Sequence, residues 1–100
     1  MAESTDPIRA THNEPVHRFE VQVDGETAML TYRKQDDTIT FIHTRVPNGI
    51  GRHGIGSELV RTGLEYAKSQ GLKVIPLCPF AAAFIQNHSE YLDLLAEKHR

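Results

Sequence analysis

Four glycines gather in one short segment of this 100-residue chain, at Gly49, Gly51, Gly54 and Gly56. Glycine lets backbone N–H groups approach a ligand closely and adopt the left-handed conformations that form an anion-binding nest. A helix beginning next to these residues would add unpaired N–H donors and the positive end of its dipole. The segment therefore predicts a cradle for a pyrophosphate group. A flexible loop without a ligand is the alternative interpretation, although a connection from a strand to a helix rarely needs four glycines.

Two common nucleotide-binding motifs agree less well with the same segment. Gly49-x-Gly51-x-x-Gly54 matches the glycines of the dinucleotide-binding fingerprint, which also needs an acidic residue about 20 positions further on. The stretch 73–79 contains no acidic residue. The phosphate-binding loop of nucleoside triphosphatases needs a lysine directly after its last glycine. Here isoleucine follows Gly54 and serine follows Gly56, so this class of enzyme is excluded.

The residues before the cradle predict strands. Apolar and polar residues alternate from residue 18 to the turn dipeptide Asp24-Gly25, which favours a tight hairpin. β-forming side chains dominate the next two runs. We therefore expect an antiparallel meander over about 18–24, 26–34 and 38–46. Because strict alternation is blurred in the second and third runs, we expect those central strands to be covered on both faces.

The residues after the cradle predict helices and one more strand. A helical spacing of apolar residues predicts a helix over about 54–70, with Gly71 at its C-terminal end. The β-branched run 72–77 predicts a strand that pairs in parallel with an earlier one. Pro79 is suited to begin a second helix, and Ser89 is suited to cap a last one.

Length and composition restrict the class of protein. One hundred residues support one compact domain; the polar, proline-containing start predicts a flexible tail over 1–17, followed by a domain over 18–97. A formal net charge of -2 argues against nucleic acid as a partner. Since no long apolar stretch or apolar leader is present, we expect a cytoplasmic protein with no membrane partner. The single cysteine, Cys78, excludes an intramolecular disulfide, and the spacing of the histidines predicts no metal site.

Three segments that follow one another along the chain resemble a known family. They are His43-Thr44-Arg45-Val46-Pro47, His53-Gly54-Ile55-Gly56-Ser57 and Pro76-Leu77-Cys78-Pro79-Phe80. The middle segment resembles motif A of the GNAT superfamily of acyl-CoA-dependent N-acetyltransferases. Together the three resemble its very small single-domain subfamily. The resemblance implies an α/β (α+β) fold with a mixed sheet: three antiparallel strands, then a helix, a parallel strand and C-terminal helices.

The resemblance also implies which residues bind acetyl-CoA. Val46 would offer strand-edge hydrogen bonds to the pantetheine arm, and a backbone N–H near it would stabilise the oxyanion. Arg45 stands where the small subfamily commonly has glutamate, which excludes a carboxylate base at that position. The pyrophosphate would be held by the cradle residues Gly51, Arg52, His53, Gly54, Ile55, Gly56 and Ser57. Gly51 departs from the superfamily pattern, because it aligns with an arginine or glutamine; Arg52 follows one place later.

Two side chains are candidates for catalysis in this setting. His43 is the nearest candidate base, because histidine titrates near neutral pH and strand alternation places it on the same face as Arg45. A histidine hydrogen-bonded within the sheet is an equally good interpretation. Cys78 precedes Pro79 at a predicted helix N-terminus and follows the parallel strand, where α/β sheets place reactive groups. Its thiol would accept the acetyl group, protonate the departing CoA thiolate, or pack beside the pantetheine arm.

The resemblance leads to one leading function and one alternative. The leading hypothesis is an N-acetyltransferase that moves acetyl from acetyl-CoA to an amine carried by a small molecule or a protein. The alternative is a module that binds CoA or acetyl-CoA with little or no catalysis. Only the first predicts that free CoA thiol is released in the presence of an amine.

Overall fold

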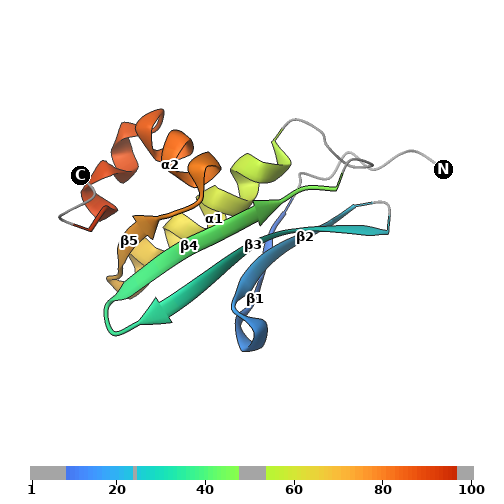
Figure 1. Cartoon of the computed structure of the whole chain (residues 1–100), viewed down its shortest axis with the longest axis horizontal. Helices are drawn as coiled ribbons and strands as arrows, with labels where there is room; N and C mark the ends of the chain where they lie inside the picture. The colour runs from blue at the N-terminus through green and yellow to red at the C-terminus, as the bar shows by residue number, and fades with distance from the viewer. Residues whose placement is uncertain (1–8, 24, 48–53, 97–100) are drawn as a thin grey trace.

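The computed structural model describes residues 9–23, 25–47 and 54–96. They form a five-stranded mixed sheet in the order β1-β2-β3-β4-β5, with helices packed against it (Figure 1). The strands are β1 Thr11–Asn13, β2 Arg18–Val23, β3 Glu26–Gln35, β4 Thr38–Arg45 and β5 Lys73–Pro76. The helices are the 3-10 helix η1 Glu14–Val16, α1 Ile55–Gln70, α2 Pro79–Gln86 and the 3-10 helix η3 Ser89–Leu94.

The predicted meander and the parallel strand are both present. β2, β3 and β4 pair antiparallel in sequence order, and β5 pairs with β4 in parallel. Tight turns join the meander because Gly25 and Asp36 adopt left-handed backbone conformations, with φ of 80° and 56°. Glycine adopts this region freely, and aspartate tolerates it better than most residues do. The predicted helix over 54–70 is confirmed, and it ends at Gly71 with φ 69°.

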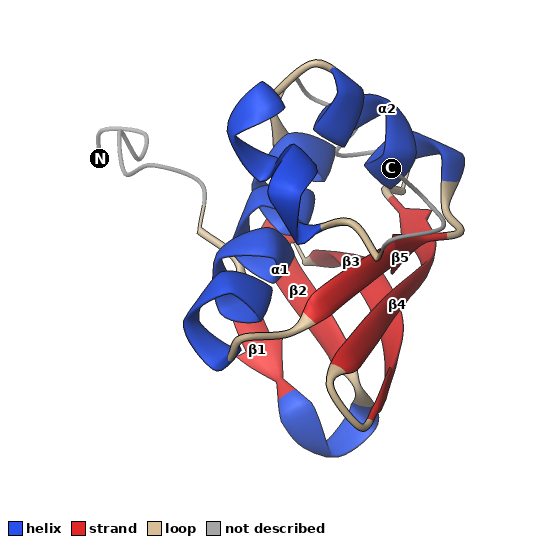
Figure 2. Cartoon of the chain, turned by 90° about the vertical axis from the view of Figure 1, so that its left-hand side faces the viewer, coloured by secondary structure: helices blue, strands red, loops and turns tan. Residues whose placement is uncertain are grey.

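Helices α1, α2 and η3 lie together on one face of the sheet, which we call the covered face (Figure 2). Leu30 and Phe41 of the sheet are fully buried there. Gly63 of α1 lets the helix approach closely, because a Cβ at that position would lie 2.9 Å from the Phe41 ring. Among the described residues, no helix covers the opposite face, which we call the open face.

The prediction that the central strands are covered on both faces is wrong. Polar side chains of β3 and β4, among them Thr31, Arg33 and Thr38, alternate with the buried ones and belong to the open face. Threonine favours strands as strongly as many apolar residues do. A run rich in threonine therefore predicts a strand correctly without indicating that both of its faces are buried.

The prediction of a tail over 1–17 is wrong for residues 11–17. β1 pairs antiparallel with β2, and η1 connects the two strands. The ring of His12 stacks on Phe19 at 4.3 Å, and its Nε2 lies 2.6 Å from the Tyr32 hydroxyl. Hydrophobic patterning misses this segment because its main contact with the core is made by a histidine ring.

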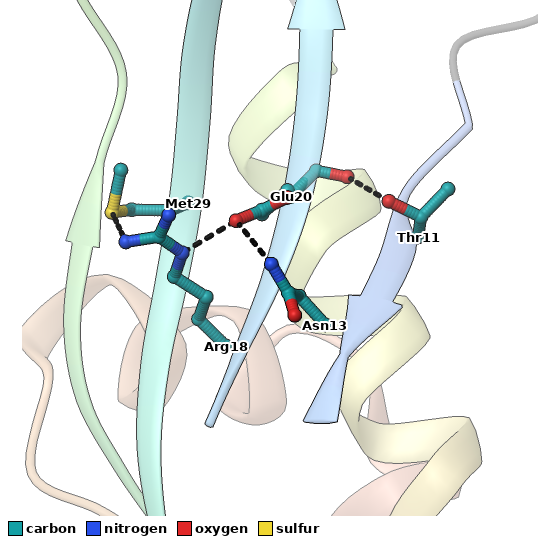
Figure 3. A network of polar contacts seen from close by, with 5 residues as sticks. All are labelled: Thr11, Asn13, Arg18, Glu20 and Met29. Carbon is teal, nitrogen blue, oxygen red and sulfur yellow. Dashed lines mark hydrogen bonds and ion pairs between the residues drawn. The ribbon is translucent and has the colours of Figure 1, made fainter. Parts of the chain in front are cut away.

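Polar contacts on the open face also attach β1 to the sheet (Figure 3). The carboxylate of Glu20 accepts hydrogen bonds from Arg18 Nε and from Asn13 Nδ2, the latter at 3.2 Å. Arg18 also reaches Met29 Sδ at 3.7 Å. The hydrogen bond from Arg18 is the main cause that holds the pKa of Glu20 below its usual value, and this effect exceeds the opposing effect of burial.

The last helical segment differs from the prediction in type and in its cap. Residues Ser89–Leu94 form a 3-10 helix rather than an α-helix; its N-cap is His88, without a side-chain cap bond. The chain then returns to the sheet, where Leu95 forms a parallel bridge with Val74. This bridge covers the outer edge of β5. Within the described residues, no helix is long and apolar enough to span a bilayer.

Candidate active site

β4 and β5 separate at one end of the sheet and form a fork. Their parallel pairing ends at Phe41 and Pro76, and the N–H of Cys78 donates a last hydrogen bond to the Phe41 carbonyl at 3.0 Å. β4 continues with β3 as far as Arg45, which pairs with Met29. Beyond Phe41, the edge of β4 that faces β5 has no strand partner in the part of the chain that the structure describes. Backbone donors and acceptors at such an edge are free to pair with an extended ligand.

A β-bulge at Ile42 decides which side chains enter the fork. Thr31 pairs with His43, but the next residue of β3, Tyr32, pairs with Phe41, so that Ile42 is an extra residue on β4. A bulge reverses the alternation of side chains beyond it. Thr44, rather than His43, therefore shares the covered face with Phe41.

Thr44 contacts Cys78 across the fork. Thr44 Oγ1 lies 3.1 Å from Cys78 Sγ, and either group is able to donate. The cysteine side chain is buried, and its residue occupies the N-cap position of α2 without a side-chain cap bond. A hydroxyl and a thiol that share a hydrogen bond can pass a proton or stabilise a thiolate.

His43 points away from this pair. Neighbouring residues on a strand project to opposite faces, and both His43 and Arg45 are exposed on the open face. The backbone carbonyl of His43 accepts a hydrogen bond from Thr31 Oγ1 at 3.3 Å. The shared face of His43 and Arg45 was predicted correctly. The two catalytic candidates, His43 and Cys78, nevertheless lie on opposite faces of the sheet.

The first turn of α1 lies beside the fork. Gly54, at φ 94°, is the N-cap, and as a glycine it provides no side-chain cap bond. The ring of Phe80, two residues after Cys78, packs against Gly56, where a Cβ would lie 2.9 Å from Phe80 Cζ. Ile55 is fully buried, so it anchors this turn in the core and offers only its backbone to a ligand.

The remaining predicted site residues divide into two groups. Val46 is partly buried and packs against the core at the end of β4, and Ser57 is half-buried in the first turn of α1. Gly51, Arg52 and His53 lie outside the described residues. Among the described residues, no group of three or more histidine, cysteine, aspartate and glutamate side chains is placed to hold a metal ion.

Comparisons with known proteins agree with this geometry. A family model described as GCN5-related N-acetyl-transferase matches residues 18–94. The chain belongs to the GCN5-related N-acetyltransferase family. A similar solved structure is the NMR solution structure of a GCN5-like N-acetyltransferase candidate from Staphylococcus aureus. It has 28% sequence identity and a TM-score of 0.69, with 89% of this chain and 88% of that chain covered.

Membership of the GCN5-related N-acetyltransferase family confirms the resemblance and the mixed α/β fold, and it assigns the chain to acetyl transfer as a class of reaction. Two residues of the fork, Thr44 and Phe80, were not identified as site residues from the sequence. Thr44 was missed because the bulge that turns it toward Cys78 leaves no local signal in the sequence. Phe80 belongs to the third family-like segment, and Gly56 belongs to the second. A contact between these two segments was the signal that could have identified Phe80 as a site residue.

Proposed function

We propose that this protein transfers an acetyl group from acetyl-CoA to an amine at the fork between β4 and β5. One observation carries the proposal: β4 extends beyond β5 next to the N-terminus of α1, whose N-cap is a glycine without a side-chain cap bond. A strand edge and an uncapped helix N-terminus are the two backbone groups that an extended, phosphorylated cofactor needs. Family membership favours transfer over binding alone.

The residues present fit acetyl-CoA. Among the described residues other than its chain neighbours, nothing lies within 4 Å of the place where a Cβ of Gly54 would be, which leaves room for a ligand at the helix N-terminus. N–H groups of Gly54, Ile55, Gly56 and Ser57 would hold the pyrophosphate, together with Gly51, Arg52 and His53 of the preceding segment. The near-neutral net charge of the chain agrees with binding by oriented backbone dipoles rather than by a basic surface.

The β4 edge and Phe80 would position the other parts of the cofactor. When bound, acetyl-CoA supplies an acetyl group activated as a thioester. The backbone of Val46 would hydrogen-bond the amides of the pantetheine arm, and a backbone N–H near Val46 would stabilise the oxyanion. Phe80, which is 43% exposed, offers an apolar ring beside the first turn of α1.

Cys78 and Thr44 would act on the departing thiolate. In direct transfer, the amine nitrogen forms the new bond to the acetyl carbon and the bond to the CoA sulfur breaks. The Cys78 thiol gives its proton to that sulfur, and Thr44 then donates its hydroxyl hydrogen bond to the Cys78 thiolate. The proton that the nitrogen loses on becoming an amide passes to solvent, and Cys78 takes up a proton to complete the cycle. In the two-step alternative, Cys78 itself carries the acetyl group before the amine takes it.

His43 would serve the amine from the open face. An ammonium group must lose a proton before it attacks, and an exposed histidine at the fork is suited to accept it. His43→Gln should lower kcat/KM more at pH 7 than at pH 9, where more of the amine is already neutral. An equal loss at every pH would assign His43 a structural role.

Ligand binding and turnover test the proposal separately. Thermal unfolding should shift upward with acetyl-CoA and CoA and not with NAD, because a ligand that binds the native state stabilises it. Turnover is measured as amine-dependent release of free CoA thiol. Stabilisation by NAD alone would contradict the proposal, as would CoA binding without turnover of any amine.

Intact mass spectrometry distinguishes the two roles of Cys78. After incubation with acetyl-CoA, an added acetyl group that is absent in Cys78→Ser supports the two-step route. Serine keeps the size and hydrogen bonding of the side chain but is a far weaker nucleophile and acid. Turnover without any adduct supports direct transfer with Cys78 as the acid. Unchanged turnover in Cys78→Ser would exclude both roles.

A further inference from the structure

A hollow of about 270 Å³ lies on the open face of the sheet, at the end of the β3–β4 hairpin. It is separate from the residues proposed to hold acetyl-CoA. Its lining includes Arg33, Asp36, Asp37, Thr38, Thr40 and Ile75. Of these lining residues, Thr40 of β4 and Ile75 of β5 lie nearest the fork, and they are paired directly across the two strands.

Thr40 contributes a hydroxyl to the lining of the hollow. Its residue is only 7% exposed, and it is one of the two buried polar residues among those described. Within the described part of the chain, its hydroxyl has no hydrogen-bond partner, whereas the hydroxyl of Thr38 is bonded to Asp37 Oδ1 at 3.3 Å. Among the described residues, no buried side-chain nitrogen or oxygen lacks a hydrogen-bond partner, so the Thr40 hydroxyl keeps some accessible surface at the hollow. The Thr40 hydroxyl is therefore available to a polar group that enters the hollow.

The charges around the hollow have both signs. Arg33 contributes a guanidinium, and Asp36 and Asp37 contribute carboxylates. No ion pair joins Arg33 to either aspartate among the described residues. The neighbouring ammonium of Lys73 is directed to the Asp93 carbonyl at 3.3 Å. The hollow thus offers one unpaired cation and two anions, which match a ligand with a carboxylate and an ammonium group.

The hollow leads directly to the fork. Ile42 follows Thr40 by two residues on β4, which is roughly 7 Å along a strand. Leu77 follows Ile75 by two residues and lies just beyond the end of β5, where its N–H donates to the Ile75 carbonyl at 3.2 Å. Both side chains are unusually exposed for apolar residues, at 43% for Ile42 and 59% for Leu77. Both residues lie along the chain between the lining of the hollow and the fork, and exposed apolar side chains suit the aliphatic part of a ligand.

We infer that the hollow binds the head group of the acceptor, and that the acceptor is a free α-amino acid with a second amine on an aliphatic side chain. Arg33 binds its carboxylate, Asp36 and Asp37 bind its α-ammonium group, and the Thr40 hydroxyl bonds to the same head group. The aliphatic stem lies over Ile42 and Leu77, and the terminal amine enters the fork. Acetylation of the terminal amine rests on the proposed function, whereas binding of the amino acid in the hollow does not.

Binding is tested first without acetyl-CoA, by NMR titration of the whole chain with L-lysine and L-ornithine. We expect amide shifts centred on residues 33–40 and 75. Cadaverine, which lacks the carboxylate, and 6-aminohexanoate, which lacks the α-amine, should each bind at least about 10-fold more weakly. A lysine blocked at both backbone ends separates a free amino acid from a protein side chain. Equal binding of the blocked lysine would overturn the assignment.

Substitutions in the hollow provide the second test. Arg33→Gln and Asp36→Asn should each weaken lysine binding about 10-fold, and Thr40→Val about 3-fold. Asparagine tolerates the left-handed backbone at position 36. Lys68→Gln on α1 and Glu26→Gln at the far end of β3 are matched control substitutions and should leave binding unchanged. Equal binding in Arg33→Gln and Asp36→Asn would overturn the head-group site.

Turnover distinguishes this inference from the proposed function. With lysine as acceptor, Arg33→Gln should raise KM for the amine about 10-fold and leave kcat and the KM for acetyl-CoA unchanged. Lysine binding in the hollow without any turnover would preserve the subsite and contradict the transferase. Turnover of another amine with no shifts in the hollow would preserve the transferase and overturn the subsite.

Discussion

Thr44 Oγ1 of β4 lies 3.1 Å from Cys78 Sγ at the start of α2, so that one hydrogen bond joins the two sides of the fork. The bulge at Ile42 creates this contact, because without the extra residue Thr44 would project to the open face. The contact places a hydroxyl beside the one thiol of the chain, at the point where the cofactor's sulfur is proposed to depart.

Thr44→Val tests the partner of the Cys78 thiol. Valine has nearly the shape of threonine but cannot hydrogen-bond, so we expect kcat to fall about 10-fold while the KM for acetyl-CoA changes little. Urea unfolding should show a loss of stability of about 1 kcal/mol or less. Thr27→Val, far from the fork at the beginning of β3, is the matched control. A kcat equal to that of the unchanged protein would show that Cys78 acts without Thr44.

Two α1 glycines should respond differently to the same substitution. A Cβ at Gly63 would meet the fully buried Phe41, whereas a Cβ at Gly56 would meet Phe80, which is 43% exposed and able to move. Overpacking in a core costs about 1–3 kcal/mol, against a gain of about 1 kcal/mol from replacing a helical glycine. Gly63→Ala should therefore destabilise the fold more than Gly56→Ala in urea unfolding.

The Gly56→Ala variant should instead weaken cofactor binding. The displaced Phe80 ring would move into the space beside the first turn of α1, and we expect acetyl-CoA affinity to fall several-fold in a calorimetric titration. The double variant Gly56→Ala, Phe80→Ala should recover part of the affinity, because the smaller side chain removes the overlap. Unchanged affinity in the single variant would place acetyl-CoA away from Phe80.

The Arg18–Glu20 contact should make stability depend on acid pH. The pKa of Glu20 is held below its usual value of 4.5 in the fold, mainly by the hydrogen bond from Arg18. As the pH falls, Glu20 therefore becomes protonated in the unfolded chain before it does so in the folded chain. The contribution of this contact to stability is complete above about pH 4.5 and is lost as the pH falls through the lower pKa of the folded state. Arg18→Gln should cost about 1 kcal/mol at pH 7, a reduced figure because Arg18 is partly exposed.

Chemical unfolding at pH 7 and pH 3 measures this effect. The difference between the unchanged protein and Arg18→Gln should shrink at pH 3, because the unfolded chain already carries a protonated Glu20 there. Arg61→Gln, which removes an exposed helical ion pair with Glu58, is the control for loss of a guanidinium. A difference that stays constant from pH 7 to pH 3 would show that Arg18 acts through packing alone.

Tyr91 should make stability depend on alkaline pH. Burial, followed by its 2.7 Å hydrogen bond to Glu65, raises the pKa of Tyr91 to about 12. The folded chain keeps this proton while the unfolded chain loses it near pH 10, so stability falls as the pH rises from about 10 to 12. Tyr91→Phe should cost about 1 kcal/mol at pH 7 and remove a phenol transition near pH 12 in an ultraviolet titration. If Tyr91→Phe instead removes a phenol transition near pH 10, the raised pKa of Tyr91 is contradicted.

The sequence by itself determined the elements whose signals are local. Alternation identified β2, and β-forming side chains identified β3 and β4. The spacing of apolar residues identified α1 with its end at Gly71, and Pro79 marked the start of α2. Three short motifs identified the family. These features depend on neighbouring residues in the chain, and their physical causes act over one or two turns of backbone.

Tertiary structure decided which residues meet. The bulge at Ile42 moved Thr44 to Cys78 and left His43 on the open face, because one extra residue reverses the direction of every later side chain on the strand. The docking of β1 depended on His12 finding Phe19, a partner in another strand. The sequence contains Gly56 and Phe80, but only the packing of α1 against α2 brings them into contact. Local pattern fixes the type of element, whereas partners distant in sequence fix its neighbours.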